Sequence, residues 1–192
     1  MEVSFKVLEL ISRSLGLPSK HLNEFFKDDM SISWLNSYPE CLKPELALGI
    51  RGHRDVGALT LIYHDEVGGL EMKCKENGQW VPAPPMPNSF VLNVADCMQV
   101  LTNDKYESVE HRAMVNDTRR RLSIPLFLIP SHYVMIKPLD ELACGVLSSV
   151  VDIKDKRSNI KMSINLVEHG LAKCGLANST NIEYPRFKQT SL

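Results

Sequence analysis

Apolar residues at the start of the chain recur every three to four positions, at the spacing of one face of an α-helix. They are Phe5, Val7, Leu8, Leu10, Ile11 and Leu15. This periodicity predicts an amphipathic helix over residues 5–15. Gly16 and Pro18 end that helix, and Ser19 can cap a short second helix over residues 19–26.

From residue 31 onward, short runs rich in β-branched and aromatic residues alternate with turn signals. The expected strands are SISWLNSY, ALTLIY, GLEMK, QWVPA, SFVLNV, MQVLT, EHRAMV, RLSIPLFLI and HYVMIK. Many short strands at close, regular spacing predict a sandwich or barrel rather than alternating strands and helices. After residue 143 this rhythm is lost. We therefore expect a mainly β fold with one or two N-terminal helices and an irregular C-terminal segment.

The composition narrows the class of protein. With 192 residues, 44% of them hydrophobic, the chain can bury a core as one domain. Its net charge of −1 gives no sign of nucleic-acid binding, which would need a basic face. No apolar run approaches the ~20 residues of a membrane span, and the charged N-terminal segment is unlike a signal peptide. The five cysteines are odd in number and lack Cys-x-x-Cys spacing, which favours reduced thiols and a cytoplasmic protein.

A candidate metal site starts with His53 and Asp55, which stand two residues apart beside a run with strand character. Side chains two apart in a strand share a face, so both could bind one ion. The pair alone is weak evidence, because His-x-Asp occurs by chance. His111 lies in another strand-like run, and several strands between the two segments could return the chain to this place. Two imidazoles and one carboxylate form the facial triad of non-haem iron(II) enzymes, although zinc can use the same ligands.

A rival triad exists in the same stretch. His64 and Glu66 repeat the His-x-acid spacing, and His111 could again complete the set. However, His64 ends an expected strand and the following DEVGG has the composition of a turn, so Glu66 is expected to face solvent. The residues alone favour the first triad and leave the second open.

Two further pairs of residues share strand faces and suit a polar ligand. Arg121 and Ser123 lie on one face of RRRLSIPLF, and an inward-facing arginine is costly unless it meets an anion. The planar guanidinium can hold a carboxylate through two parallel hydrogen bonds, to which a hydroxyl adds another. Asn36 and Tyr38 share a face upstream and can donate hydrogen bonds to a small polar ligand. Taken singly, Asn36 and Tyr38 also fit ordinary strand and turn residues.

Taken in order, these segments resemble the plant-type 2-oxoglutarate- and iron(II)-dependent dioxygenase family. The elements that carry the similarity are NSYPECLKPELALG, GHRDVGALTLIYHDEVGGLEM, NGQWVPAPPMPNSFVLNVADCMQVLTNDKYESVEHRAMVN and RRRLSIPLFLIPS. An ordered set of motifs over ~100 residues is far more specific than any one of them. The resemblance implies a double-stranded β-helix, which is a distorted jelly roll.

The resemblance also assigns roles to the candidate residues. The implied iron ligands are His53, Asp55 and His111. Arg121 and Ser123 match the Arg-x-Ser pair that binds the distal carboxylate of 2-oxoglutarate, and Tyr38 and Asn36 match positions that contact this cosubstrate. The rival triad falls away, because the family usually has Gln-Asp in its place. The implied cofactors are iron(II), 2-oxoglutarate and dioxygen, with ascorbate as a candidate reductant.

Some features depart from the family pattern. Arg54 replaces a frequent threonine and points off the metal face, and Ser37, Glu40 and Leu42 replace a tyrosine and two prolines. Family members usually carry a longer N-terminal region and a different C-terminal helix, so we expect a truncated or divergent member. Its expected parts are a helical remnant over residues 1–30, the dioxygenase jelly roll over residues 31–138 and a divergent segment over residues 139–192.

The implied function is that of an oxidoreductase. It would couple oxidative decarboxylation of 2-oxoglutarate to hydroxylation or desaturation of a small plant metabolite, of the phenolic, flavonoid or hormone class. The alternative is a non-catalytic remnant of the roll that binds metal or a partner, because segments that usually enclose the organic substrate are divergent here. Iron binding without consumption of 2-oxoglutarate would favour that alternative.

Overall fold

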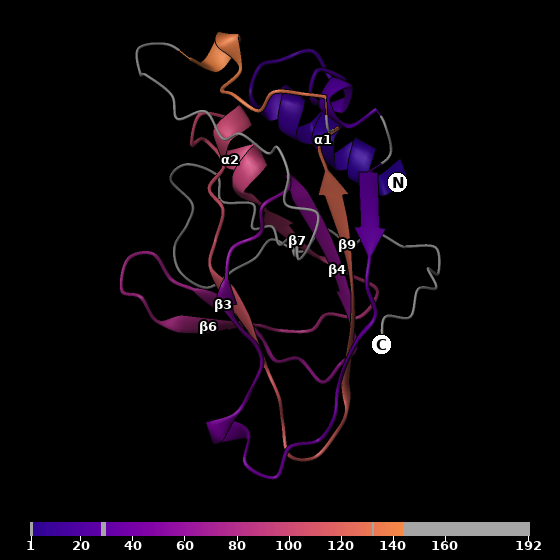
Figure 1. Cartoon of the computed structure of the whole chain (residues 1–192), viewed down its shortest axis with the longest axis vertical. Coiled ribbons are helices and arrows are strands. Elements are labelled where there is room, and N and C mark those ends of the chain that lie inside the picture. The colour runs from indigo at the N-terminus through magenta and orange to yellow at the C-terminus, as the bar shows by residue number, and fades with distance from the viewer. Residues whose placement is uncertain (1, 28–29, 132, 144–192) are drawn as a thin grey trace.

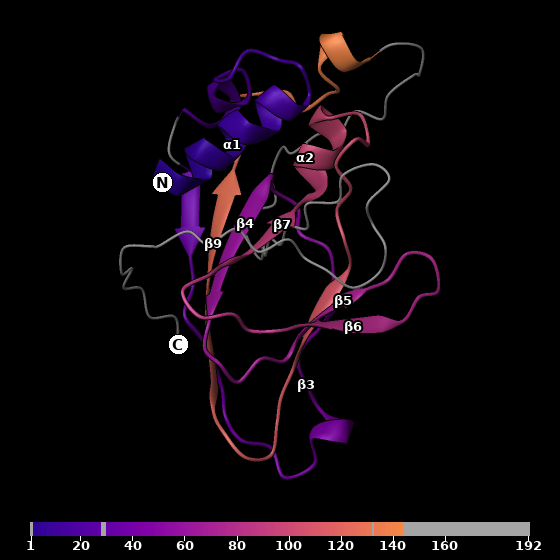
Figure 2. The ribbon, with the colours of Figure 1, turned by 180° about the vertical axis from the view of Figure 1, so that it is seen from behind.

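The computed structural model describes residues 2–27, 30–131 and 133–143, which form two antiparallel β-sheets with the two α-helices at one end (Figures 1 and 2). One sheet has the strand order β1-β9-β4-β7, with β2 also paired to β9, and the other has the order β3-β8-β5-β6. The fold is the distorted jelly roll that the sequence predicts, confirming a mainly β protein.

The first sheet is organised around its longest strand, β9. Its strands are β1 (Met30–Ser33), β2 (Asn36–Tyr38), β4 (Leu59–His64), β7 (Val91–Val94) and β9 (Arg121–Ile129). Alternate residues of a strand face opposite sides of the sheet. Accordingly, Leu126 and Leu128 belong to the main core, whereas Pro125 and Phe127 line a cavity inside the roll.

The second sheet faces that cavity from the other side. Its strands are β3 (Leu48–His53), β5 (Leu70–Lys73), β6 (Trp80–Ala83) and β8 (His111–Met114). The β5–β6 hairpin turns at Gly78, whose φ of +69° suits the Asn-Gly sequence. β3 and β8 pair with shifts of register that bring His53 opposite His111.

The helices pack against the first sheet and complete the main core (Figure 1). They are α1 (Glu2–Ser14), α2 (Asp96–Leu101) and the 3-10 helices η1 (Leu22–Phe26) and η3 (Asp140–Leu142). The 3-10 helix η2 (Pro44–Leu46) has no buried residue and lies at the opposite end of the molecule. Leu8 and Ile11 of α1 share a buried cluster with Met98 of α2 and with Leu59 and Leu128 of the sheet. Because the core occupies this face of the sheet, the opposite face is left to line the inside of the roll.

The run MQVLT is helical, so the prediction of a strand there is wrong. Its residues Met98–Leu101 lie in α2, where Cys97, Met98 and Leu101 are buried. Their spacing places them on one side of a helix, against the main core. A short apolar run fits a buried strand and a buried helix equally well, and packing on α1 decides between them.

Two other elements of the structure differ from those predicted from the sequence. Residues 133–137, from the run HYVMIK, form no strand in the part of the chain that the structure describes. Prolines at positions 130 and 138 flank this run and cannot donate a ladder hydrogen bond. The second N-terminal helix is the shorter η1, and His21 rather than Ser19 occupies its N-cap.

Three further expectations from the sequence concern membrane spans, the oxidation state of the cysteines and the domain boundaries. No helix among the described residues is long and apolar enough to cross a membrane. Cys41 and Cys97 are free thiols, but Cys74 is disulfide-bonded, so the expectation of reduced thiols is wrong at Cys74. The domain boundaries after residues 30 and 138 stay a prediction, and most of the segment 139–192 lies outside the described residues.

Candidate functional site

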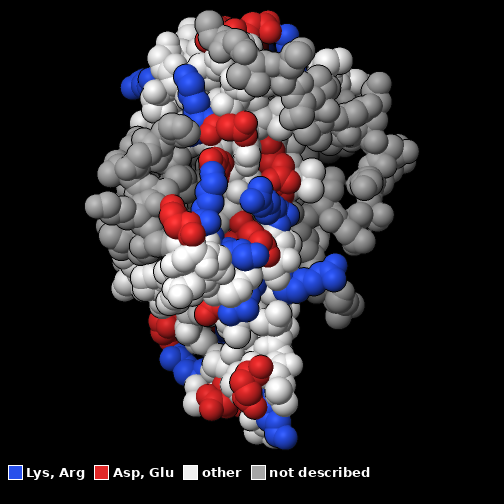
Figure 3. All heavy atoms as spheres, turned by 90° about the vertical axis from the view of Figure 1, so that its left-hand side faces the viewer, with Lys and Arg blue, Asp and Glu red and all other residues white. Residues whose placement is uncertain are grey.

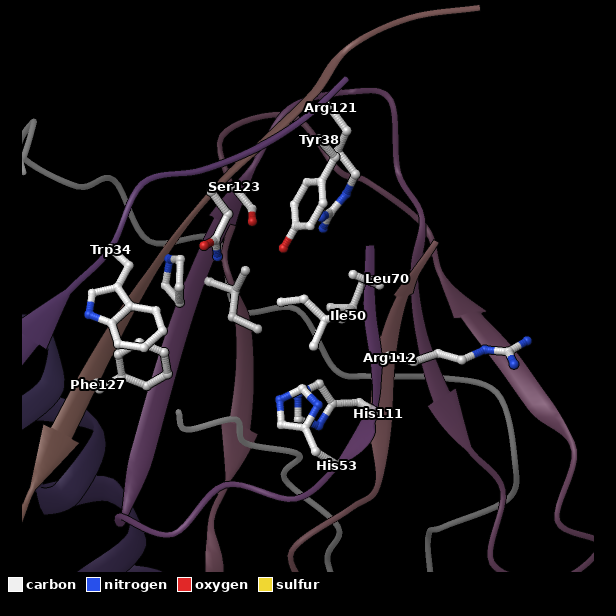
Figure 4. Close-up of a pocket in the computed structure, with 14 residues that line it drawn as sticks. Trp34, Tyr38, Ile50, His53, Leu70, His111, Arg112, Arg121, Ser123 and Phe127 are labelled. Atoms are coloured by element: carbon white, nitrogen blue, oxygen red, sulfur yellow. The ribbon is translucent and has the colours of Figure 1, made fainter. Parts of the chain in front are cut away.

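A cavity of about 460 Å³, including its open mouth, lies between the two sheets. Figure 4 shows His53 and His111 together at one end and Arg121, Tyr38 and Ser123 toward the other. The histidines come from the second sheet, and the other group comes from β2 and β9 of the first. One cavity therefore joins the candidate metal residues to the candidate anion-binding residues.

The three candidate metal residues converge at one point. His53 ends β3, His111 begins β8, and their ring centroids lie 4.2 Å apart. Asp55 follows two residues after His53, in the loop that leads to β4. One ligand atom from each residue lies within 4.8 Å of the others. Among the described residues, this is the group of three that meets the geometry for holding a metal ion.

Backbone contacts fix which nitrogen each histidine presents to the centre. His53 Nδ1 lies 2.8 Å from the Arg51 carbonyl oxygen, and His111 Nδ1 lies 3.2 Å from the Val109 carbonyl oxygen. Because a carbonyl only accepts, each Nδ1 donates and each Nε2 is left for a metal. Burial and the neighbouring His53 lower the pKa of His111 to about 3, so its ring is neutral, as a ligand must be.

Asp55 supplies the negative charge of the cluster and is fully buried. Burial raises its pKa to about 6, against the opposing effects of His53 and Thr60. Its Oδ1 lies 3.4 Å from His53 Nε2 and has no hydrogen-bond partner. A buried polar atom without a partner is uncommon, and a divalent cation would supply what Oδ1 lacks. Two imidazole nitrogens and one carboxylate oxygen fit iron(II), and they also suit zinc.

The rival triad is not assembled. The side chain of Glu66 is 73% exposed and forms an ion pair with Arg119. His64 ends β4, where its Nδ1 lies 3.0 Å from the Asp65 carbonyl oxygen. Burial, and to a lesser degree Arg121, lower the pKa of His64. His64 and Glu66 therefore stand apart from the converging group formed by His53, Asp55 and His111.

The opposite end of the cavity is built by the pairing of β2 with β9. In this register Tyr38 lies opposite Arg121 and Asn36 lies opposite Ser123, so all four side chains reach the same face of the sheet. Arg121 is 2% exposed, with its guanidinium carbon 4.9 Å from the centre of the Tyr38 ring. Arg121 Nη1 has no hydrogen-bond partner. A buried guanidinium nitrogen without an acceptor suits a carboxylate ligand such as 2-oxoglutarate.

Arg112 also borders the cavity, but its guanidinium points away from it (Figure 4). Its Nε lies 2.7 Å from Glu71, and its guanidinium carbon lies 4.3 Å from the centre of the Trp80 ring. On the face shown in Figure 3, Lys and Arg side chains are interleaved with Asp and Glu side chains. The charge of Arg112 is thus neutralised outside the cavity, whereas Arg121 Nη1 is buried and has no hydrogen-bond partner.

Gly68 and Gly69, which the sequence indicates only as a turn, hold Arg121 in place. The Gly68 carbonyl accepts a hydrogen bond from Arg121 Nε. Gly69 has φ +85°, and a Cβ there would lie 2.9 Å from the Met114 carbonyl oxygen and 3.4 Å from Arg121 Cδ. Only glycine combines this backbone conformation with such a close approach. The paired glycines were the available signal, but their contact with Arg121 depends on the tertiary fold.

Replacing Gly69 with alanine is expected to weaken 2-oxoglutarate binding several-fold, because the new methyl group must displace Arg121 or the Met114 carbonyl. Gly78→Ala is the matched control, since Gly78 has φ +69° but nothing within 4 Å of its added Cβ. Left-handed strain should lower the stability of both variants by about 1–2 kcal/mol. Thermal unfolding and titration with 2-oxoglutarate measure the two effects. Equal affinity in the two variants would contradict the role given to Gly69.

Comparison with known proteins agrees with this geometry. Residues 30–130 match the family model of the 2OG-Fe(II) oxygenase superfamily. Gibberellin 20 oxidase 3 of Arabidopsis thaliana is 43% identical over 146 residues, covering 76% of this chain and 38% of that protein. Protein DMR6-LIKE OXYGENASE 1 of the same plant is 44% identical over 137 residues, covering 71% of this chain and 39% of that protein.

Among solved structures, that of JOX2 in complex with 2OG, Fe and JA superposes with a TM-score of 0.67 at 35% identity. The match covers 73% of this chain and 42% of JOX2. The chain therefore spans about two fifths of the length of the curated relatives that it matches. The motifs, the jelly roll and the match over residues 30–130 show that this chain belongs to the 2OG-Fe(II) oxygenase superfamily, as a member of its plant-type dioxygenase family.

Proposed function

We propose that this chain is a 2-oxoglutarate- and iron(II)-dependent oxygenase that hydroxylates or desaturates a small organic molecule. The observation that carries the proposal is the pair of unsatisfied buried atoms in one region of the fold. Asp55 Oδ1 lacks a hydrogen-bond partner beside the two imidazoles, and Arg121 Nη1 lacks one across the cavity from them. Iron and a dicarboxylate would satisfy both.

Each candidate residue has a role in this proposal. The residues that would hold iron are His53, Asp55 and His111. Arg121 would bind the distal carboxylate of 2-oxoglutarate through its free guanidinium nitrogen, and Ser123, Tyr38 and Asn36 would add hydrogen bonds from the same sheet face. Bound iron would supply the activation of dioxygen that converts 2-oxoglutarate to succinate and carbon dioxide and oxidises the organic substrate.

The remaining wall of the cavity supports an apolar or aromatic organic substrate. Trp34 and Phe127 meet edge to face, with ring centroids 5.6 Å apart, and both line the cavity. Ile50, Ile62 and Leu70 add an aliphatic surface. Such a wall suits a plant hormone, phenolic or flavonoid better than a highly charged metabolite. The names of a gibberellin oxidase and of a JOX2 complex with JA among the similar proteins support the hormone class.

The test is release of succinate from 2-oxoglutarate by the full chain reconstituted with iron(II), ascorbate and dioxygen. We expect succinate release that depends on iron, and a faster rate with some members of a panel of hormones and phenolics. Asp55→Ala is the matched inactive control. Stoichiometric iron binding without any consumption of 2-oxoglutarate would contradict the proposal and support a non-catalytic binding protein.

A further inference from the structure

Thr60 lies in β4 with its hydroxyl turned toward Asp55. Neither residue has any solvent-exposed surface. Thr60 Oγ1 donates a hydrogen bond of 3.3 Å to Asp55 Oδ2. Leu59 and Leu61, on either side of Thr60, belong to the main core on the opposite face of the sheet. β4 therefore places the Thr60 hydroxyl against the Asp55 carboxylate, while the two neighbouring residues of the strand point into the core.

The hydrogen bond makes the two carboxylate oxygens of Asp55 unequal. Oδ2 is occupied by the Thr60 hydroxyl. Oδ1 has no hydrogen-bond partner and lies 3.4 Å from His53 Nε2, on the side where the imidazoles converge. A carboxylate held in this way offers one oxygen to a metal and keeps the other coordination positions open.

The backbone around Asp55 is fixed separately, by the start of α2. The Asp96 amide donates to the Asp55 carbonyl at 2.9 Å, and the Cys97 amide donates to the Gly57 carbonyl at 2.8 Å. The Ala95 amide donates to the Ala58 carbonyl at 3.0 Å. These bonds hold the backbone of the loop, so the Asp55 carboxylate can move mainly by rotation of its side chain. The hydrogen bond from Thr60 restrains that rotation.

We infer that Thr60 is a positioning residue of the metal centre, which holds Asp55 so that Oδ1 alone faces the metal. This inference rests on the proposed function, because it takes His53, Asp55 and His111 as the metal ligands. Groups that hydrogen-bond to metal ligands orient them, and losing one typically weakens metal binding about 10–100-fold. Thr60 is not itself one of the three ligands, and it lies outside the His53-x-Asp55 pair from which the site was first inferred.

The experiment is titration of the full chain with cobalt(II) under argon, without 2-oxoglutarate, followed by the visible absorption of the bound ion. Cobalt(II) accepts the same nitrogen and oxygen donors as iron(II). Thr60→Val keeps the shape of the side chain but removes the hydroxyl, and should weaken binding about 10–100-fold. Thr60→Ser restores the hydroxyl and should recover most of the affinity and the absorption spectrum of the original chain.

Thr102→Val is the matched control. Thr102 is also fully buried, but its hydroxyl donates to the Met98 carbonyl of α2 at 2.8 Å rather than to a metal residue. Its loss should lower the unfolding temperature without changing cobalt affinity. Should Thr60→Val fail to fold, Thr60→Ala removes the same hydroxyl without adding atoms.

Three results would overturn the inference. Unchanged cobalt affinity in the variants that lack the hydroxyl would show that Thr60 does not position Asp55. Equal losses in Thr60→Val and Thr60→Ser would assign the effect to packing rather than to the hydroxyl. Failure of the original chain to bind cobalt(II) or iron(II) would refute the metal site itself, and with it the proposed function, which distinguishes that failure from the first two.

Discussion

Replacing Asp55 with alanine is expected to abolish iron retention. The change removes the only carboxylate of the converging group and leaves two imidazoles to hold a divalent cation. A cation in such a buried place without a negative partner is strongly disfavoured. The measurement is iron per chain after anaerobic reconstitution and desalting, which should be near one for the original chain and near zero for the variant.

His64→Ala and Glu66→Ala are the controls for this prediction. Both alter the rival His-x-acid pair, and Glu66 lies on the surface in an ion pair with Arg119. Iron content should be unaltered in each. Near-stoichiometric iron in Asp55→Ala would rule out the ligand assignment, and loss of iron in both controls would revive the rival triad.

Replacing Arg121 with lysine is expected to weaken 2-oxoglutarate binding while iron stays in place. Lysine keeps the positive charge but loses the planar fork and the hydrogen bond from Nε to the Gly68 carbonyl. A loss of about 1–3 kcal/mol, or roughly 5–150-fold in affinity, is expected for a charge-assisted pair. Titration of the anaerobic iron form with 2-oxoglutarate, followed by visible charge-transfer absorption, measures the affinity.

Arg119→Lys is the control for the Arg121 variant. Arg119 belongs to the same basic run, but its side chain is 60% exposed and pairs with Glu66 at the surface. Exposed pairs of this kind contribute little. The Arg119 variant should therefore bind 2-oxoglutarate as the original chain does. If Arg121→Lys also keeps full affinity, Arg121 does not hold the cosubstrate.

The sequence pattern was sufficient to predict those parts of the site whose residues lie within a few positions of one another. The period of two along a strand places Arg121 and Ser123 on one face of their strand, and likewise Asn36 and Tyr38 on one face of theirs, whatever the rest of the fold does. In the structure all four line one cavity. The resemblance added the order of the motifs, from which the jelly roll followed. These features depend on short-range geometry, so the sequence alone could predict them.

Features that depend on packing between residues far apart in the sequence could not be predicted in this way. The helical state of Met98–Leu101 depends on burial against α1, because a short apolar run fits either helix or strand. The contact of Gly69 with Arg121 and that of Thr60 with Asp55 involve side chains and turns whose partners no local pattern names.

The sequence by itself determined the residue types of the site and the faces on which they lie. Only the tertiary structure decided that His53 stands opposite His111 across β3 and β8, and that Tyr38 stands opposite Arg121 across β2 and β9. The physical reason is that strand register is fixed by hydrogen bonds and side-chain packing between segments far apart in the chain. Periodicity within one strand carries no information about its partner.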